Sequence, residues 1–256
     1  MHKVTPVSAL SDNYVWLIHG EDPSRVAIVD PGEAAPVQAK LCEHGLTPEA
    51  ILITHRHWDH VNGIEDLLAV YDIPVYGPAE EPVPCRSQGL RDGDTVSLDH
   101  LGLTFRVLGI PGHTLGHIAY HGHGLLLSGD TLFAGGCGRM FEGEAAQMLA
   151  SLDKLAGLPD KTYLYCGHEY TLKNLAFCEA VEPDNPWLHK LRQRAEQRLA
   201  ANQPTLPTML GEEKQYNVFL RCREAAIQAS ASRKAGQELH RPDGVFATLR
   251  QWKDQF

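Results

Sequence analysis

The sequence lacks any long apolar run and any paired cysteine motif. No stretch approaches the roughly 20 apolar residues that a membrane-spanning helix needs. The start, Met-His-Lys-Val-Thr-Pro-Val, lacks the apolar core of a secretion signal. The six cysteines contain no Cys-x-x-Cys pair, so we expect reduced thiols with mostly structural roles. These absences predict a cytoplasmic protein with no membrane partner.

The chain also has no net positive charge. The formal net charge is −9, which argues against a nucleic acid as the partner. The charge is uneven, because residues 1–170 carry 10 Lys and Arg against 22 Asp and Glu, whereas residues 171–256 carry 13 against 10. The excess of basic residues in 171–256 suggests that this part binds an anionic ligand. The alternative is that the uneven charge is a random feature of the surface.

The most distinctive stretch that is present is Thr-His-Arg-His-Trp-Asp-His at residues 54–60. It follows the apolar run 50–53, which has the length and β-branched content of a buried strand. Asn62-Gly63 and the spaced apolar residues after it predict the start of a helix. We therefore expect the motif on a loop at the carboxyl end of a strand. Its imidazole and carboxylate groups are typical ligands of zinc and similar ions, so it predicts a metal site rather than a solvated polar loop.

Two series of short apolar segments predict two sheets. The hydrophobic content of 43% and the charged content of 21% are typical of a globular protein. We expect strands at 14–18, 26–29, 50–53, 74–76, 95–98, 103–108, 118–120, 125–127 and 162–165, and helices at 37–41, after Gly63 and at 145–155. This order predicts two stacked sheets flanked by helices, with a surface loop at 78–84. After Thr171 the apolar spacing is helical and no convincing strand remains, so we expect one domain at 1–170 and a small helical domain at 171–256.

Three further segments place a histidine or an aspartate beside a glycine just past a strand. They are Pro111-Gly112-His113-Thr114, Ser128-Gly129-Asp130-Thr131 and Cys166-Gly167-His168-Glu169. With the first motif they supply seven ligands: His55, His57, Asp59, His60, His113, Asp130 and His168. That set exceeds the needs of one tetrahedral zinc ion and suits two ions that share a bridging carboxylate and a water. No Gly-x-Ser-x-Gly or phosphate-binding Gly-x-x-x-x-Gly-Lys-Ser/Thr motif competes for the chemistry.

Other candidate residues are expected to have structural roles. His117 follows the Gly-His-Thr turn, and we expect it to support the site rather than to bind metal. His121 and His123 flank Gly122 in a predicted hairpin turn and are not expected to be ligands. Cys137 has no neighbouring acid or base in the sequence, which favours packing over a nucleophilic role.

These residues resemble the metallo-β-lactamase superfamily, whose signature is Thr-His-x-His-x-Asp-His with three outlying ligands. Within it, the chain is similar from end to end to the glyoxalase II (hydroxyacylglutathione hydrolase) family. The similarity is clearest at residues 132–139, 165–171 and 250–256. The resemblance implies an α+β fold, a four-layer αββα sandwich, followed by a small all-α domain that contributes to the substrate pocket.

The resemblance also implies roles for single residues. His55, His57 and His113 would hold one metal ion and Asp59, His60 and His168 a second, with Asp130 bridging. The expected ions are zinc, with iron or manganese as alternatives, and the catalytic carboxylates are Asp59 and Asp130. The glutathione part of the substrate would lie against Arg139, Phe141, Tyr170, Arg250 and Lys253. Some relatives have lysine in place of Arg139 and tyrosine in place of Phe141.

The implied reaction is the hydrolysis of S-2-hydroxyacylglutathione, such as S-D-lactoylglutathione, to a 2-hydroxy acid (D-lactate) and glutathione in methylglyoxal detoxification. The leaving thiol has an ordinary pKa of about 8.5, so it can depart as a thiolate and needs no general acid. Nothing in the sequence requires more than a monomer. The alternatives are a persulfide dioxygenase with one iron, another hydrolase of the same superfamily, or a non-catalytic module that binds metal or glutathione.

Overall fold

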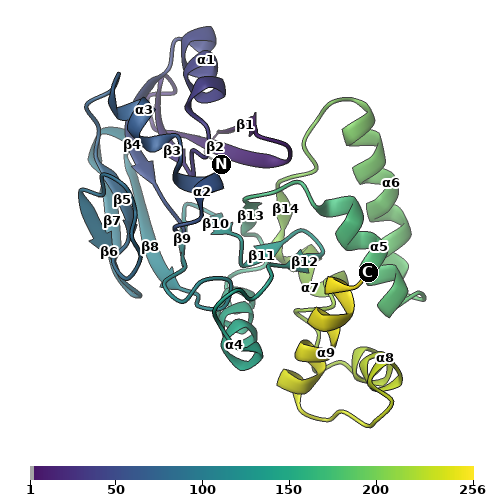
Figure 1. Ribbon diagram of the computed structural model, residues 1–256. Helices are drawn as coiled ribbons and strands as arrows, with labels where there is room; N and C mark the ends of the chain where they lie inside the picture. Colours follow the sequence, from purple (N-terminus) through teal and green to yellow (C-terminus); the bar gives the residue numbers. More distant parts are fainter. Residues whose placement is uncertain (1–2) are drawn as a thin grey trace. The chain divides into compact units, whose positions relative to one another are not determined.

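The structure, a computed structural model, describes residues 3–256 (Figure 1). The chain forms two compact units, and it passes between them several times. The first unit contains the described residues as far as Gly109, with Leu115–Gly129 and Tyr165–Glu169. The second unit contains Ile110–Thr114, Asp130–Leu164 and Tyr170–Phe256.

A six-stranded mixed sheet forms one layer of the first unit. Its strands are, in spatial order, β1 (Val4–Ala9), β2 (Asn13–His19), β3 (Arg25–Val29), β4 (Thr47–Leu52), β5 (Val75–Pro78) and β6 (Gln88–Leu90). The first three pair antiparallel, and β3 to β6 pair parallel. A parallel pair needs a crossover, which helix α1 (Ala34–His44) supplies between β3 and β4. Residues 54–60 follow the carboxyl end of β4, an inner strand of the parallel part of the sheet.

The two faces of this sheet explain why the strands read as continuous apolar runs. Val15 and Leu17 of β2 belong to a buried cluster with residues of α1 and α3 (Ile64–Leu68). Trp16 lies between them in sequence, and its indole Nε1 donates to the carbonyl of Cys166 at 3.0 Å. Strands covered on both faces cannot alternate polar and apolar residues.

A second sheet is built on an antiparallel meander in the first unit. Strands β7 (Thr95–Leu98), β8 (Leu103–Gly109), β9 (Ile118–Gly122) and β10 (Leu125–Gly129) pair in that order. A short 3-10 helix, Asp99–Leu101, joins the first two strands. Tyr120 of β9 joins the two sheets, because its hydroxyl donates to the carbonyl of Ile53 at 2.8 Å. The strands predicted in the first unit are confirmed, whereas β1 and β6 of the first sheet were not predicted.

The second unit is mainly helical. Its helices are α4 (Ala145–Ala156), α5 (Thr171–Val181), α6 (Pro186–Ala200), α7 (Leu210–Tyr216), α8 (Ala225–Ala235) and α9 (Pro242–Asp254). Its strands are β11 (Leu132–Phe133), β12 (Gly136–Cys137), β13 (Tyr163–Cys166), whose last two residues lie in the first unit, and β14 (Thr208–Met209). The helical character after Thr171 is confirmed, but β14 was not expected, because two residues leave no period to read. None of the helices among residues 3–256 has the length and apolarity that crossing a bilayer requires.

Candidate metal centre

The 54–60 motif lies after β4, as predicted, but it is not all loop. Helix α2 (Trp58–Val61) begins inside it, and the amide of Asn62 donates to the carbonyl of Trp58 at 2.8 Å. Helix α2 was not expected, whereas the predicted helix start at Asn62-Gly63 is confirmed by α3, which begins at Ile64 with Gly63 as its N-cap. Gly63 has a second role, since a Cβ there would lie 2.7 Å from the carbonyl oxygen of Pro31. The glycine permits a close approach of two backbone segments.

Three predicted ligands come together within the first unit. Asp59 and His60 lie on α2, and His168 follows β13. The Nε2 atoms of His60 and His168 lie 3.6 and 3.4 Å from Oδ2 of Asp59. One ligand atom from each residue lies within 4.8 Å of the others, and both histidines are buried. Two imidazoles and a carboxylate at this spacing suit a divalent metal ion such as zinc.

Carboxylates on neighbouring segments orient both histidines. Nδ1 of His60 lies 3.1 Å from Oδ2 of Asp30, and Nδ1 of His168 lies 2.8 Å from Oδ1 of Asp12. A proton held between Nδ1 and a carboxylate leaves the lone pair on Nε2, the atom nearest Asp59. Asp30 is itself held, because it accepts from the amide and the hydroxyl of Thr54 at 2.8 and 2.7 Å. Neither aspartate was among the residues that the sequence predicted for the site.

Asp59 is held in place by Asn13. The amide of the Asn13 side chain donates to Oδ2 of Asp59 at 3.0 Å and to its backbone carbonyl at 3.2 Å. The first bond orients the carboxylate and the second holds the backbone of the same residue, so less entropy is lost when Asp59 binds an ion.

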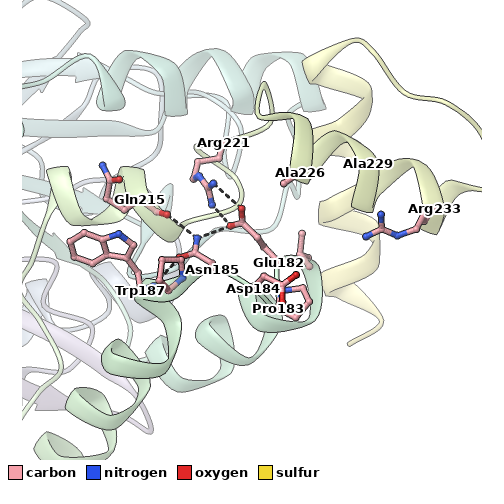
Figure 2. Close-up of a pocket in the computed structure, with 12 residues that line it drawn as sticks. Glu182, Pro183, Asp184, Asn185, Trp187, Gln215, Arg221, Ala226, Ala229 and Arg233 are labelled. Atoms are coloured by element: carbon pink, nitrogen blue, oxygen red, sulfur yellow. Dashed lines mark hydrogen bonds and ion pairs between the residues drawn. The ribbon is translucent and has the colours of Figure 1, made fainter.

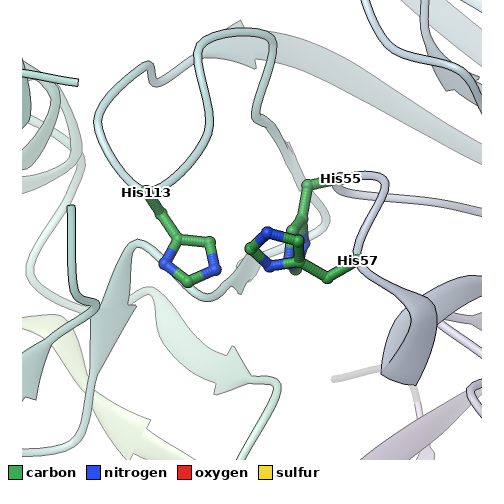
Figure 3. A group of neighbouring side chains, drawn as sticks. All are labelled: His55, His57 and His113. Carbon is green, nitrogen blue, oxygen red and sulfur yellow. The ribbon is translucent and has the colours of Figure 1, made fainter. Parts of the chain in front are cut away.

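The remaining histidines of the motif lie side by side on the same loop (Figure 3). Nε2 of His55 is 3.1 Å from Nδ1 of His57, and the hydroxyl of Thr54 is 3.1 Å from Nδ1 of His55. The ring of His117 stacks on the ring of His55 with centroids 4.6 Å apart and an angle of 14° between the planes. Nδ1 of His117 lies 3.0 Å from the carbonyl of Ile118. This stacking is consistent with the predicted supporting role of His117.

Glu81 holds the metal loop from the segment that was predicted to be a surface loop. Its carboxylate accepts from the amide of Arg56 at 2.6 Å and from the amide of Gly116 at 3.1 Å. The side chain is buried, so the prediction for residues 78–84 was wrong at this position. Glu81 is buried because its carboxylate accepts from amides of two loops that are far apart in the sequence, those of Arg56 and Gly116.

The second unit carries the other two predicted ligands. His113 lies on the segment after β8 (Figure 3), and Asp130 begins the segment that follows β10. Nε2 of His113 is 3.6 Å from Oδ2 of Asp130, and Nδ1 lies 2.8 Å from the carbonyl of Arg139. Both residues are buried. A Cβ on Gly138 would lie 1.9 Å from the carbonyl oxygen of Asp130, so only glycine fits there.

The residues assigned to glutathione lie in the second unit and differ in exposure. Arg139 is exposed and its Nε is 3.4 Å from Oδ1 of Asp254. Phe141 is 63% exposed, and its ring lies 5.2 Å from the ring of His113. The ring of Tyr170 contacts Phe133 with centroids 5.3 Å apart.

The two cations of α9 point inward. Arg250 is 4% exposed, and its guanidinium donates to the carbonyl of Cys137 at 2.8 Å and lies 3.0 Å from Asp254. Nζ of Lys253 donates to Oδ1 of Asn174. Burial and the nearby Arg250 lower the pKa of Lys253 to about 8. Contacts of these two residues with a substrate stay a prediction.

Cys137 has the structural role expected of it. The thiol is buried, and burial raises its pKa above the ordinary value. A raised pKa keeps the thiol protonated at neutral pH and makes it a poor nucleophile.

A cavity of about 480 Å³ lies elsewhere in the second unit (Figure 2). The ion pair of Glu182 with Arg221 lines it, together with Trp187. None of the predicted site residues lines it. We assign no substrate role to this cavity.

Comparison with known proteins decides the family. The sequence pattern of the hydroxyacylglutathione hydrolase C-terminus matches residues 169–256, and that of the metallo-beta-lactamase superfamily matches residues 10–168. The chain is 53% identical over 256 residues to the hydroxyacylglutathione hydrolase of Nitrosomonas eutropha, covering 100% of both chains. It is 52% identical over 255 residues to that of Alkalilimnicola ehrlichii, again covering 100% of both. The chain belongs to the hydroxyacylglutathione hydrolase family.

Solved structures share the fold of this family member. ETHE1 from Myxococcus xanthus matches with a TM-score of 0.66 and 24% identity, covering 99% of this chain and 98% of the other. The BLEG-1 B3 metallo-β-lactamase matches with a TM-score of 0.63 and 23% identity, covering 86% and 99%. TTHA1623 in a di-iron-bound form matches with a TM-score of 0.55 and 30% identity, covering 64% and 91%. The predicted α+β fold of metallo-β-lactamase type with a C-terminal helical part is confirmed.

Proposed function

We propose that this hydroxyacylglutathione hydrolase family member cleaves the thioester of S-2-hydroxyacylglutathione to a 2-hydroxy acid and glutathione. The observation that carries the proposal is about 50% identity over the whole chain to proteins of that name. S-D-lactoylglutathione is the expected substrate and D-lactate the expected acid. The group of Asp59, His60 and His168, in which both histidines are buried, would supply the metal-binding chemistry that this hydrolysis needs.

The proposed centre holds two ions. His55, His57 and His113 would bind one, Asp59, His60 and His168 the other, with Asp130 bridging. The imidazole and carboxylate groups of these seven residues, which the sequence motifs supply, suit two divalent ions. Zinc is the expected ion, and an all-nitrogen-and-oxygen set also admits iron or manganese. The relative TTHA1623 has been solved with two irons.

The side chains prepare this site for hydrolysis. When bound, the two ions would polarise the thioester carbonyl and lower the pKa of a water molecule. Asp12 and Asp30 hold protons at Nδ1 of His168 and His60, so that both Nε2 atoms stay available as ligands. Asp59 and Asp130 would supply two negative charges, which offset half of the charge of two divalent ions. No side chain need donate a proton to the leaving thiolate, whose ordinary pKa is about 8.5.

The substrate is proposed to be held by the second part of the chain. Residues 1–170 would form the catalytic domain and residues 171–256 the substrate-binding domain. The excess of basic residues in 171–256 and the separate family pattern over 169–256 support this division. The residues proposed to contact glutathione are Arg139, Phe141, Tyr170, Arg250 and Lys253. Glutathione carries carboxylates, which the cations Arg139, Arg250 and Lys253 can bind by charge-assisted hydrogen bonds. We propose a monomer that acts in the cytoplasm, with no nucleic-acid or membrane partner.

The test is a thiol-release assay on the purified protein with S-D-lactoylglutathione, combined with elemental analysis of the bound metal. The proposal predicts release of free glutathione in proportion to the metal content. Oxygen uptake with glutathione persulfide, and no thiol release from the thioester, would favour a persulfide dioxygenase. Metal or glutathione binding with neither reaction would favour a binding module.

A further inference from the structure

Side chains of the C-terminal helices hold the hairpin formed by β11 and β12, residues 132–137. The hairpin is buried, and its two strands pair only through Leu132 with Cys137 and Phe133 with Gly136. Two such pairs are too few for a hairpin to hold its own shape. Instead, the five consecutive carbonyls of residues 133–137 accept hydrogen bonds from side chains. Asn217 donates to the carbonyls of Phe133 and Gly136 at 3.2 and 3.1 Å. The other three donors are Asn174 to Ala134 at 2.9 Å, the thiol of Cys178 to Gly135 at 3.2 Å, and Arg250 to Cys137 at 2.8 Å.

Glu213 of α7 lies at the centre of this arrangement. It is fully buried, and its Oε2 accepts from the amide of Gly135 at 2.9 Å and from the side chain of Asn217 at 3.1 Å. Its Oε1 accepts from the hydroxyl of Thr208 at 2.8 Å and from the hydroxyl of Tyr216. Burial raises the pKa of Glu213, and the four donors oppose that shift. Glu213 therefore holds both the turn of the hairpin and the side chain of Asn217.

The segments on either side of the hairpin connect it to two predicted metal ligands, Asp130 and His113. Asp130 lies two residues before it, and the amide of Gly138 just after it donates to the carbonyl of Thr131 at 3.2 Å. Arg139 lies two residues after it, and the carbonyl of Arg139 lies 2.8 Å from Nδ1 of His113. A shift of the hairpin would move Asp130 and the acceptor that orients His113 together.

We propose that Glu213 and Asn217 are positioning residues that fix the hairpin at 132–137 and, through it, the metal ligands Asp130 and His113. This inference rests on the proposed function, in which both ligands bind metal. Neither residue is expected to touch the substrate. Their effect is to hold one arrangement of the backbone, because Asn217 donates to the buried carbonyls of Phe133 and Gly136, and Glu213 accepts from the buried amide of Gly135.

The test compares Asn217→Ala with Tyr216→Phe, both loaded with metal under the same conditions. Asn217→Ala removes the donor to two hairpin carbonyls, whereas Tyr216→Phe removes one bond to Glu213 and leaves its contact with Gly135 intact. We expect Asn217→Ala to lower both metal retention against a chelator and kcat by about tenfold, with KM unchanged. The absorption spectrum of the cobalt(II)-loaded variant should also shift. Tyr216→Phe should match the wild type in all of these.

Each outcome supports or overturns the inference. If Asn217→Ala does not fold, Asn217→Ser replaces it, because its hydroxyl can still accept from the amide of Phe219 but is too short to donate to both hairpin carbonyls, and the same losses are expected. Wild-type retention, spectrum and kcat in the variant would overturn the inference, as would equal losses in Tyr216→Phe. A wild-type protein that binds no metal or releases no thiol would instead contradict the proposed function itself.

Discussion

Oδ1 of Asp12 lies 2.8 Å from Nδ1 of His168, although 156 positions separate the two residues in the chain. His168 is buried, and its other ring nitrogen faces Asp59 at 3.4 Å. The aspartate therefore decides which nitrogen of His168 carries the proton. This places a residue from the start of the chain in control of a ligand that follows β13.

Asp12→Ala should weaken metal binding without unfolding the protein. Loss of the carboxylate frees the His168 ring to rotate and lowers its basicity, so we expect metal retention against a chelator to fall about tenfold or more. Elemental analysis after dialysis measures this. Asp72→Ala, which removes an exposed carboxylate of the same unit, is the control and should retain metal as the wild type does. Equal retention in both variants would contradict the role of Asp12.

Lys253 should give the activity an alkaline limit near pH 8. Burial and Arg250 lower its pKa to about 8, so its positive charge is present below that pH and is lost as the pH rises through it. If Lys253 attracts a carboxylate of glutathione, kcat/KM should fall above pH 8 mainly through a rise in KM. Arginine keeps its charge far above this range, so Lys253→Arg should move the fall to higher pH even if its geometry lowers the maximum. A fall at the same pH in both proteins would assign it to another group.

Glu81→Ala should lower the free energy of unfolding. The substitution leaves the amides of Arg56 and Gly116 without their carboxylate acceptor, which should cost about 1–3 kcal/mol. Urea denaturation followed by circular dichroism measures the change. The neighbouring Glu80→Ala is a matched control, because Glu80 only pairs with Arg91 at the surface, and it should change stability by less than about 0.5 kcal/mol.

Gly138→Ala should damage the metal centre. An added Cβ would lie 1.9 Å from the carbonyl oxygen of Asp130, so the backbone beside that ligand must move. We expect activity to fall about a hundredfold, with loss of bound metal. At Gly157 the same Cβ would meet its nearest atom at 3.4 Å, so Gly157→Ala should keep wild-type activity. Full activity in Gly138→Ala would show that this close contact is not essential.

The sequence predicted most of the fold because its signals are local. The apolar runs at 14–18 and 125–127 became β2 and β10, and Val37 and Leu41 became buried positions of α1. The 54–60 motif lies at the end of β4 because a strand followed by a tight polar segment has few other arrangements. Family resemblance supplied the fold type and the substrate class, which local patterns do not contain.

The partners that orient the site could not be predicted, because they depend on contacts between distant segments. Asp12, Asp30 and Glu81 each accept a hydrogen bond from a residue at least 24 positions away. Nothing in their own neighbourhood marks them. The family resemblance assigned Arg250 to glutathione, and the fold adds that its buried guanidinium donates to the carbonyl of Cys137. Only the folded chain distinguishes these cases.

The most direct test measures thiol release from S-D-lactoylglutathione and metal content together in the wild type, Asp59→Ala and Asp130→Ala. We expect two metal ions per wild-type chain. In both variants we expect loss of bound metal and a fall in turnover of about a hundredfold or more. Near-normal turnover in both variants would contradict a binuclear centre as the site of hydrolysis.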